Sequence, residues 1–260
     1  MAEPSATPGE AVWYVVGIVR PAPSLAGVPT LLPDRPLETV EGDGLWAVAC
    51  TVPADLLNDR AAEDIGRVSR LAGAHDRVLR ALLERTVVVP ARLGSLYPSR
   101  QAVAAMLHNR HRSLTAVLDQ LAGRSEWGVK VYSGLEPDQA PASLDSGARA
   151  GTAYLQRKRA ERQRSAADQQ AAAALAAELH RTVAAHADAA VTRPPQHPKL
   201  SGVRAPMLLN AAYLVDGARQ EAFTAVVRDL AARHRQGGLR VQLTGPWPPY
   251  SFAGPDGDRP

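Results

Sequence analysis

The chain has little cysteine and no long hydrophobic run, and each absence excludes a class of protein. Its 260 residues include one cysteine, Cys50, which excludes an intrachain disulfide framework and a cysteine-rich metal site. The apolar stretches, such as residues 12–19, reach about eight residues, whereas a membrane-spanning helix needs about 20. The first ten residues carry Glu3 and Glu10 and no basic segment, so they do not form a secretory signal. We therefore expect a soluble, cytoplasmic protein.

The motifs of several enzyme classes are also missing. The chain has no Gly-x-Ser-x-Gly elbow, no Gly-x-Gly-x-x-Gly and no Gly-Lys-Ser/Thr phosphate loop. His108 and His111 fall on one face of a predicted helix but are not part of a His-Glu-x-x-His motif. Cys50 lies on a predicted strand and is interpreted as a small buried hydrophobic residue. The sequence thus predicts no catalytic, cofactor-binding or metal-binding residues, and a protein that is not an enzyme.

The charge of the chain does not favour nucleic acid as a partner. Thirty basic and 26 acidic residues leave a net charge of +4, and only three of the basic residues are lysine. The most basic segment, residues 157–164, carries five positive charges spread around a predicted helix without an aromatic stacking platform. This segment is interpreted as a solvated helix, with a surface for an acidic partner as the alternative.

Hydrophobic periodicity predicts an α+β fold for the first half of the chain. Apolar β-branched runs predict strands, and an Asp-Gly pair between two of them predicts a hairpin. Apolar residues at helical spacing predict helices, with Ser99 as an N-cap and Gly73 as a possible interruption. The expected strands are residues 13–20, 37–41, 45–52 and 86–89; the expected helices are residues 53–58, 61–85 and 100–121.

The second half shows the element order of a ferredoxin-like domain. Its elements follow one another as strand, long helix, strand, strand, helix, strand. We expect strands at residues 127–132, 200–204, 207–215 and 239–243, and helices at residues 149–189 and 218–234.

These patterns predict two domains with short flanking tails. Residues 1–11 are expected to be a disordered N-terminus, and residues 12–124 an N-terminal α+β domain. Residues 125–252 are expected to form the C-terminal ferredoxin-like domain, followed by a disordered tail at 253–260.

Aromatic residues are scarce, at 5% of the chain, yet three of them lie within the seven residues 246–252. This segment also contains three prolines, which fix φ and remove backbone donors, so we expect a stiff strap outside any strand or helix interior. Two hypotheses fit it. Its aromatic side chains clamp the last strand against the other domain, or they offer a rigid surface to a partner chain; both can hold together.

Several separate motifs, in one order, resemble the gas vesicle protein family GvpL/GvpF. The resemblance extends from about residue 13 to 252. The clearest motif is Leu-Thr-Gly-Pro-Trp-Pro-Pro-Tyr-Ser-Phe at residues 243–252, which resembles the C-terminal signature of the family. The others are YVVGIVR (14–20), VPARLGSLY (89–97), EWGVKVY (126–132), GTAYL (151–155) and NAAYLV (210–215). Ala91 and Leu93 stand where the family more often has valine and phenylalanine.

The resemblance implies a modified ferredoxin-like N-terminal domain and a ferredoxin-like C-terminal domain with a long helix. It implies a non-enzymatic accessory protein of gas vesicle assembly, located at the gas vesicle in the cytoplasm, without a cofactor. The implied partners are the small hydrophobic shell protein of the GvpA type and other gas vesicle accessory proteins, with no nucleic acid and no membrane span. The candidate partner-binding residues are Trp247, Pro248, Pro249, Tyr250, Pro90, Arg92 and Tyr97.

A second class of function stays open from the residues alone. A ferredoxin-like regulatory or small-molecule-binding module would have the same element order. It predicts a pocket with converging polar groups, whereas the scaffold hypothesis predicts an exposed aromatic surface.

Overall fold

A computed structural model describes residues 11–57, 64–133, 167, 170–196, 203, 205–235 and 238–254. The chain forms two compact units, one of residues 1–126 with 246–260 and one of residues 127–245. The predicted N-terminal tail, except Ala11, lies outside the described residues, as do positions 255–260 of the predicted C-terminal tail. Both units combine helices with an antiparallel sheet, so the α+β class is confirmed.

The first unit is built on a sheet with the order β2-β3-β1-β4, with β5 also paired to β1. A two-residue Asp43-Gly44 turn joins β2 to β3, and both residues have positive φ, as a tight hairpin requires. The strands are β1 Ala11–Val19, β2 Glu38–Gly42, β3 Leu45–Pro53, β4 Val88–Pro90 and β5 Leu96–Tyr97.

Strand β1 lies at the centre of this sheet, and a shift of register at Gly17 adapts it to its neighbours. Its pairing with β3 changes register between Val15 and Gly17, while Gly17 also pairs with Pro90 of β4. A Cβ atom at position 17 would lie 2.7 Å from Cγ1 of Val88, a distance that only glycine avoids. The missing side chain therefore lets β1, β4 and the helix behind them pack closely.

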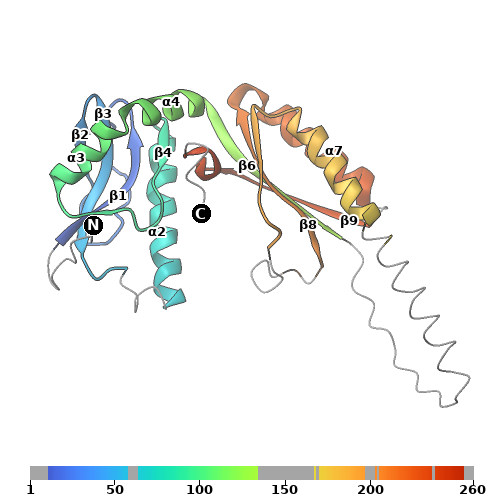
Figure 1. Cartoon of the computed structure of the whole chain (residues 1–260), viewed down its shortest axis with the longest axis horizontal. Helices are drawn as coiled ribbons and strands as arrows, with labels where there is room; N and C mark the ends of the chain where they lie inside the picture. Colours follow the sequence, from blue (N-terminus) through green and yellow to red (C-terminus); the bar gives the residue numbers. More distant parts are fainter. Residues whose placement is uncertain are drawn as a thin grey trace, which may run out of the picture. The chain divides into compact units, whose positions relative to one another are not determined.

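Helix α2, Ile65–Leu83, covers one face of this sheet (Figure 1). Asp64 caps its first turn by accepting a hydrogen bond from the backbone N–H of Arg67. Its apolar stripe joins alternate residues of β1 and β3 in one core cluster, whose members from α2 are Leu71, Ala74, Val78, Leu79 and Leu82. Gly73 does not interrupt the helix, because the stripe on both sides of it is buried in the same core.

The helical region after β5 is divided into α3, Arg100–Asn109, and α4, His111–Leu121. Ser99 caps α3 as predicted, accepting a hydrogen bond from Ala102 N. The prediction of one helix over residues 100–121 is wrong at Arg110, where φ −107° and ψ 11° leave the helical region. Residues 54–57 form turns, so the described part of the short helix predicted at 53–58 is also wrong.

The second unit contains a sheet with the order β7-β8-β6-β9. Its strands are β6 Arg124–Ser133, β7 Ala189–Thr192, β8 Met207–Asp216 and β9 Leu239–Trp247. A helix at residues 170–184 and helix α7, Gln220–Arg235, both pack on one face, where Tyr213 and Phe223 are buried in a common core. This order of elements and strands is that of a ferredoxin-like domain, as predicted.

The second unit differs from the sequence prediction in the end of its first helix, in strand β7 and in the end of strand β9. The helix ends at residue 184 rather than 189, and residues 189–192 form β7, paired antiparallel with β8. The edge strand predicted at 200–204 falls, except for position 203, outside the described residues. Pro246 and Trp247 close strand β9, although a strand was not expected there; proline is tolerated because β9 is an edge strand.

Candidate functional site

The end of β9 and the residues that follow it belong to the first unit and form the candidate site. We call residues 246–252 the C-terminal strap. After Trp247 the chain runs through Pro248 and Pro249 into a short 3-10 turn at Tyr250–Phe252, in which Phe252 N donates to the carbonyl of Pro249. The strap groups with residues 1–126 in one compact unit, while the predicted domain boundaries at 124 and 252 stay predictions.

A buried carboxylate fixes the end of the strap. Glu126, only 7% exposed, accepts one hydrogen bond from Ser251 N at 2.8 Å and another from Ser251 Oγ at 2.5 Å. Hydrogen bonds to a charged group are stronger than those between neutral groups. Both acceptor oxygens thus hold the position of the strap relative to the start of β6.

A buried pair, Tyr14 and His75, supports the middle of the strap. Tyr14 OH lies 2.9 Å from Nδ1 of His75, and the backbone N–H of Gly94 donates to the same hydroxyl oxygen at 3.3 Å. The ring of Tyr250 stacks on His75 with 6.4 Å between ring centres. Strand β1, helix α2, the loop after β4 and the strap therefore meet at one pair of side chains.

Burial sets the protonation of these groups. Desolvation lowers the pKa of His75, which is 2% exposed, against the opposing effects of the Ala91 carbonyl and Asp76. Burial raises the pKa of Tyr14 to about 12 and also raises that of Tyr250, where the carboxylate of Asp76 adds to the effect. The cluster is therefore neutral near pH 7, in agreement with its tight packing.

Trp247 contacts α2 at Arg80, further along the helix than His75. The guanidinium carbon of Arg80 is 4.4 Å from the centre of the Trp247 ring, in the geometry of a cation–π contact. Nε of Arg80 also donates to Asp76 Oδ2 at 2.7 Å, which fixes the side chain that Trp247 covers. Trp247 keeps 39% of its surface exposed, so the contact orients the residue without burying it.

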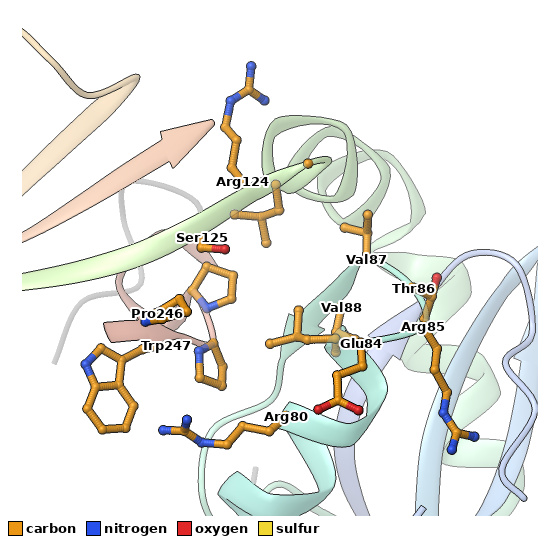
Figure 2. A pocket seen from close by; sticks show the side chains of 15 residues that line it. Arg80, Glu84, Arg85, Thr86, Val87, Val88, Arg124, Ser125, Pro246 and Trp247 are labelled. Carbon is orange, nitrogen blue, oxygen red and sulfur yellow. The ribbon is translucent and has the colours of Figure 1, made fainter. Parts of the chain in front are cut away.

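A pocket of about 620 Å³ opens between the strap and the end of α2. Figure 2 shows Arg80, Glu84, Pro246 and Trp247 among the side chains around it. Its walls come from the last turn of α2, the residues leading into β4, the start of β6 and the strap. The apolar part consists of Leu83, Val87, Val88, Leu121, Pro246, Trp247, Pro248 and Pro249.

The second candidate motif, residues 89–97, lies near the same buried pair. Gly94 takes φ +86°, which favours glycine, and its N–H reaches Tyr14 OH. The carbonyl of Arg92 accepts hydrogen bonds from Ser95 N at 3.1 Å and Ser95 Oγ at 2.9 Å. Leu93, at the tip of this loop, is 40% exposed. The motif thus forms a tight loop whose glycine is held by the hydroxyl that also supports His75.

The candidate residues divide into exposed and buried groups. Trp247 and Tyr250 are 39% and 40% exposed, and Arg92 is also exposed. Tyr97 is half-buried in β5, and its pKa is raised by burial. The three prolines among the candidates, Pro90, Pro248 and Pro249, are buried. These prolines shape the backbone. Among the candidates, the side chains that are open to a partner are Trp247, Tyr250, Arg92 and Tyr97.

Sequence reasoning missed the residues that hold the strap. Tyr14 and His75 are 61 positions apart, and Glu126 and Ser251 are 125 apart, so no local spacing connects them. One signal was present: His75 falls on the same helical face as Leu71, Val78 and Leu82, and a histidine in an apolar stripe needs a buried partner.

The described part of the chain contains neither a metal-binding cluster nor a membrane-spanning helix. Among those residues, no group of three or more His, Cys, Asp or Glu side chains is arranged to hold a metal ion. None of the helices described is both long and apolar enough to cross a membrane.

Comparison with known proteins finds gas vesicle proteins. The family model described as gas vesicle synthesis protein GvpL/GvpF matches residues 12–254. Gas vesicle protein L of a Streptomyces species is 37% identical over 251 residues, covering 93% of this chain and 92% of the relative. Gas vesicle protein F of the same species is 29% identical, covering 92% and 98%.

A solved structure supports the fold over most of the chain. The crystal structure of gas vesicle protein GvpF from an Anabaena species matches with a TM-score of 0.68, covering 95% of this chain and 98% of that one. Its sequence identity is 18%, so this likeness concerns the fold alone.

Proposed function

The chain belongs to the gas vesicle family GvpL/GvpF, and from that premise we propose that it is a non-enzymatic accessory protein of vesicle nucleation or assembly. In this proposal it binds the small hydrophobic shell protein of the GvpA type and other accessory proteins, at the gas vesicle in the cytoplasm. An apolar shell subunit that is free in water exposes surface that promotes aggregation. A scaffold that covers this surface would keep the subunit available for assembly.

The observation that supports the proposal is the pair of half-exposed aromatic rings, Trp247 and Tyr250, on a strap that is already fixed. Aromatic side chains are frequent anchors of protein interfaces because they bury a large area at little entropic cost. Prolines, the Glu126 carboxylate and the two α2 contacts hold the strap, so little ordering is left for binding. Arg92, Leu93 and Tyr97 extend the proposed contact surface.

Capture of the shell protein by the full chain tests the proposal. We expect the double variant Trp247→Ala/Tyr250→Ala to bind the shell protein at least tenfold more weakly than the wild type, because both anchors are lost. Ile65→Ala is the matched control, since Ile65 is an apolar side chain of the same unit that is 80% exposed.

The folded state of each variant is checked by circular dichroism and thermal unfolding. Equal capture by the folded double variant and by Ile65→Ala would contradict the proposed contact surface and restrict the strap to packing within its unit.

A further inference from the structure

We propose that the pocket beside the strap binds a segment of a partner protein that carries an apolar side chain next to a lysine or arginine. The inference rests on the proposed function only in that the occupant is a protein segment. It adds the chemistry of that segment. The shape of the pocket and the directions of its charged side chains point to this occupant.

The pocket has the size and the lining of a binding site. A volume of about 620 Å³ falls within the range of roughly 300–1,000 Å³ that is usual for ligand pockets. Val88 and Leu121 are buried, and Leu83 and Val87 are half-buried, so the apolar wall is continuous with the core of the unit. The prolines of the strap close the opposite side with a backbone that cannot easily collapse. The pocket can therefore accept an apolar side chain without rearrangement.

The positive charges around the pocket are already engaged. Arg80 is paired with Asp76 and covered by the ring of Trp247. Arg85 donates through Nη1 to the carbonyls of Ala26 at 2.7 Å and Ser24 at 2.9 Å. Figure 2 shows the guanidinium groups of Arg85 and Arg124 turned outward, away from Pro246 and Trp247. These arginines are therefore poorly placed to bind an acidic ligand inside the pocket.

The negative charge, in contrast, is available. Glu84 is exposed, lines the pocket, and makes no ion pair with the residues that the structure describes. It is also the C-cap of α2, so its carboxylate stands at the negative end of the helix dipole. Carboxylate and helix end together favour a cation at this place. An apolar side chain of the partner would pack on the apolar wall of the pocket, and a neighbouring lysine or arginine would pair with Glu84.

A peptide titration of the full chain tests this inference. The probes are three acetylated and amidated tetrapeptides, Leu-Leu-Lys-Leu and the same peptide with Gln or Glu in place of Lys. Nuclear magnetic resonance of the labelled protein reports both the affinity and the residues involved. We expect the lysine peptide to shift residues 80–88 and 246–249, and to bind at least fivefold more tightly than the glutamine peptide.

Glu84→Gln gives the decisive comparison. We expect it to remove the preference for lysine while leaving the weaker binding of the glutamine peptide intact. Glu178→Gln, which removes an exposed carboxylate from the helix at residues 170–184, is the matched control and should change nothing. Equal binding of the three peptides, shifts elsewhere on the protein, or a preference that survives Glu84→Gln would each overturn the inference.

The outcome is separable from that of the proposed function. Peptide binding with a lysine preference supports the pocket even where shell-protein capture fails. Shell-protein capture that depends on Trp247 but not on Glu84, with no peptide preference, rejects the pocket chemistry and keeps the strap surface.

Discussion

At the scale of single residues, the middle of the strap depends on two polar side chains that are buried without charge. The Tyr14–His75 pair joins the central strand to α2 by a hydrogen bond of 2.9 Å. Gly94 and Tyr250, from distant parts of the chain, both contact this pair. A change in the charge of His75 would therefore disturb both candidate surface segments, the strap and the loop at residues 91–95.

The lowered pKa of His75 predicts that the protein loses stability in weak acid. Below about pH 6.5 the unfolded histidine takes up a proton more readily than the folded one, because burial disfavours the charged ring. The free energy of unfolding should therefore fall as the pH falls from about 6.5 toward the lower pKa of the folded state. Denaturant unfolding followed across this range measures the effect.

Two variants assign the pH effect. His75→Gln cannot titrate, so it should reduce the pH dependence, whatever its stability at neutral pH. His180→Gln removes a histidine of the second unit whose pKa is also lowered by burial, and should leave the first unit's response in place. A wild-type pH dependence that is unchanged in His75→Gln would show that other groups cause it.

At the scale of helices and strands, hydrophobic periodicity predicts the longer elements. It does not predict the short strands that form only because they pair with a strand distant in the sequence. Helices α2 and α7 and strands β1, β3 and β8 show clear periodicity, and the sequence predicts each of them within a few residues. Strand β5 has only two residues, which pair with Trp13 and Tyr14 of β1, a strand more than 80 positions earlier in the sequence. Strand β7 begins with two alanines, which favour helix, and pairing with β8 overrides that preference.

The sequence likewise predicts one part of the candidate site and misses another. The strap and the motif at residues 89–97 are visible in the sequence because unusual residues are concentrated there. The exposure of Trp247 and the burial of Pro248 and Pro249 depend on how the strap packs on helix α2, which lies more than 160 positions earlier in the chain. Sequence alone therefore indicates which segment matters but not which of its side chains are open.

Two glycines should respond to alanine in opposite ways. Gly17→Ala should lower the free energy of unfolding by about 1–3 kcal/mol, since its Cβ would lie 2.7 Å from Val88 and 3.1 Å from Leu79. Gly73→Ala should raise it by about 0.5–1 kcal/mol, because the helix continues through Gly73 and the nearest atom, Arg77 Nη1, is 3.6 Å away. Denaturant unfolding of both variants measures the pair. A neutral Gly17→Ala would contradict the close approach of β1 to β4.

At the scale of the whole molecule, the chain consists of two α+β units. It belongs to the gas vesicle family GvpL/GvpF. A ferredoxin-like arrangement occurs in proteins of many functions, so the fold alone does not specify what this chain does. The specific features are in the first unit, where the strap brings two half-exposed aromatic rings and a lined pocket onto α2. We propose that this surface contacts the shell protein.

Photo-crosslinking during vesicle formation tests that claim most directly. A benzophenone amino acid would replace Trp247 in one variant and Ile65 in the other, both exposed apolar positions of the same unit. We expect a covalent product with the shell protein from position 247 and none from position 65. Equal shell-protein products from both positions, or no such product from position 247 in a folded protein, would contradict it.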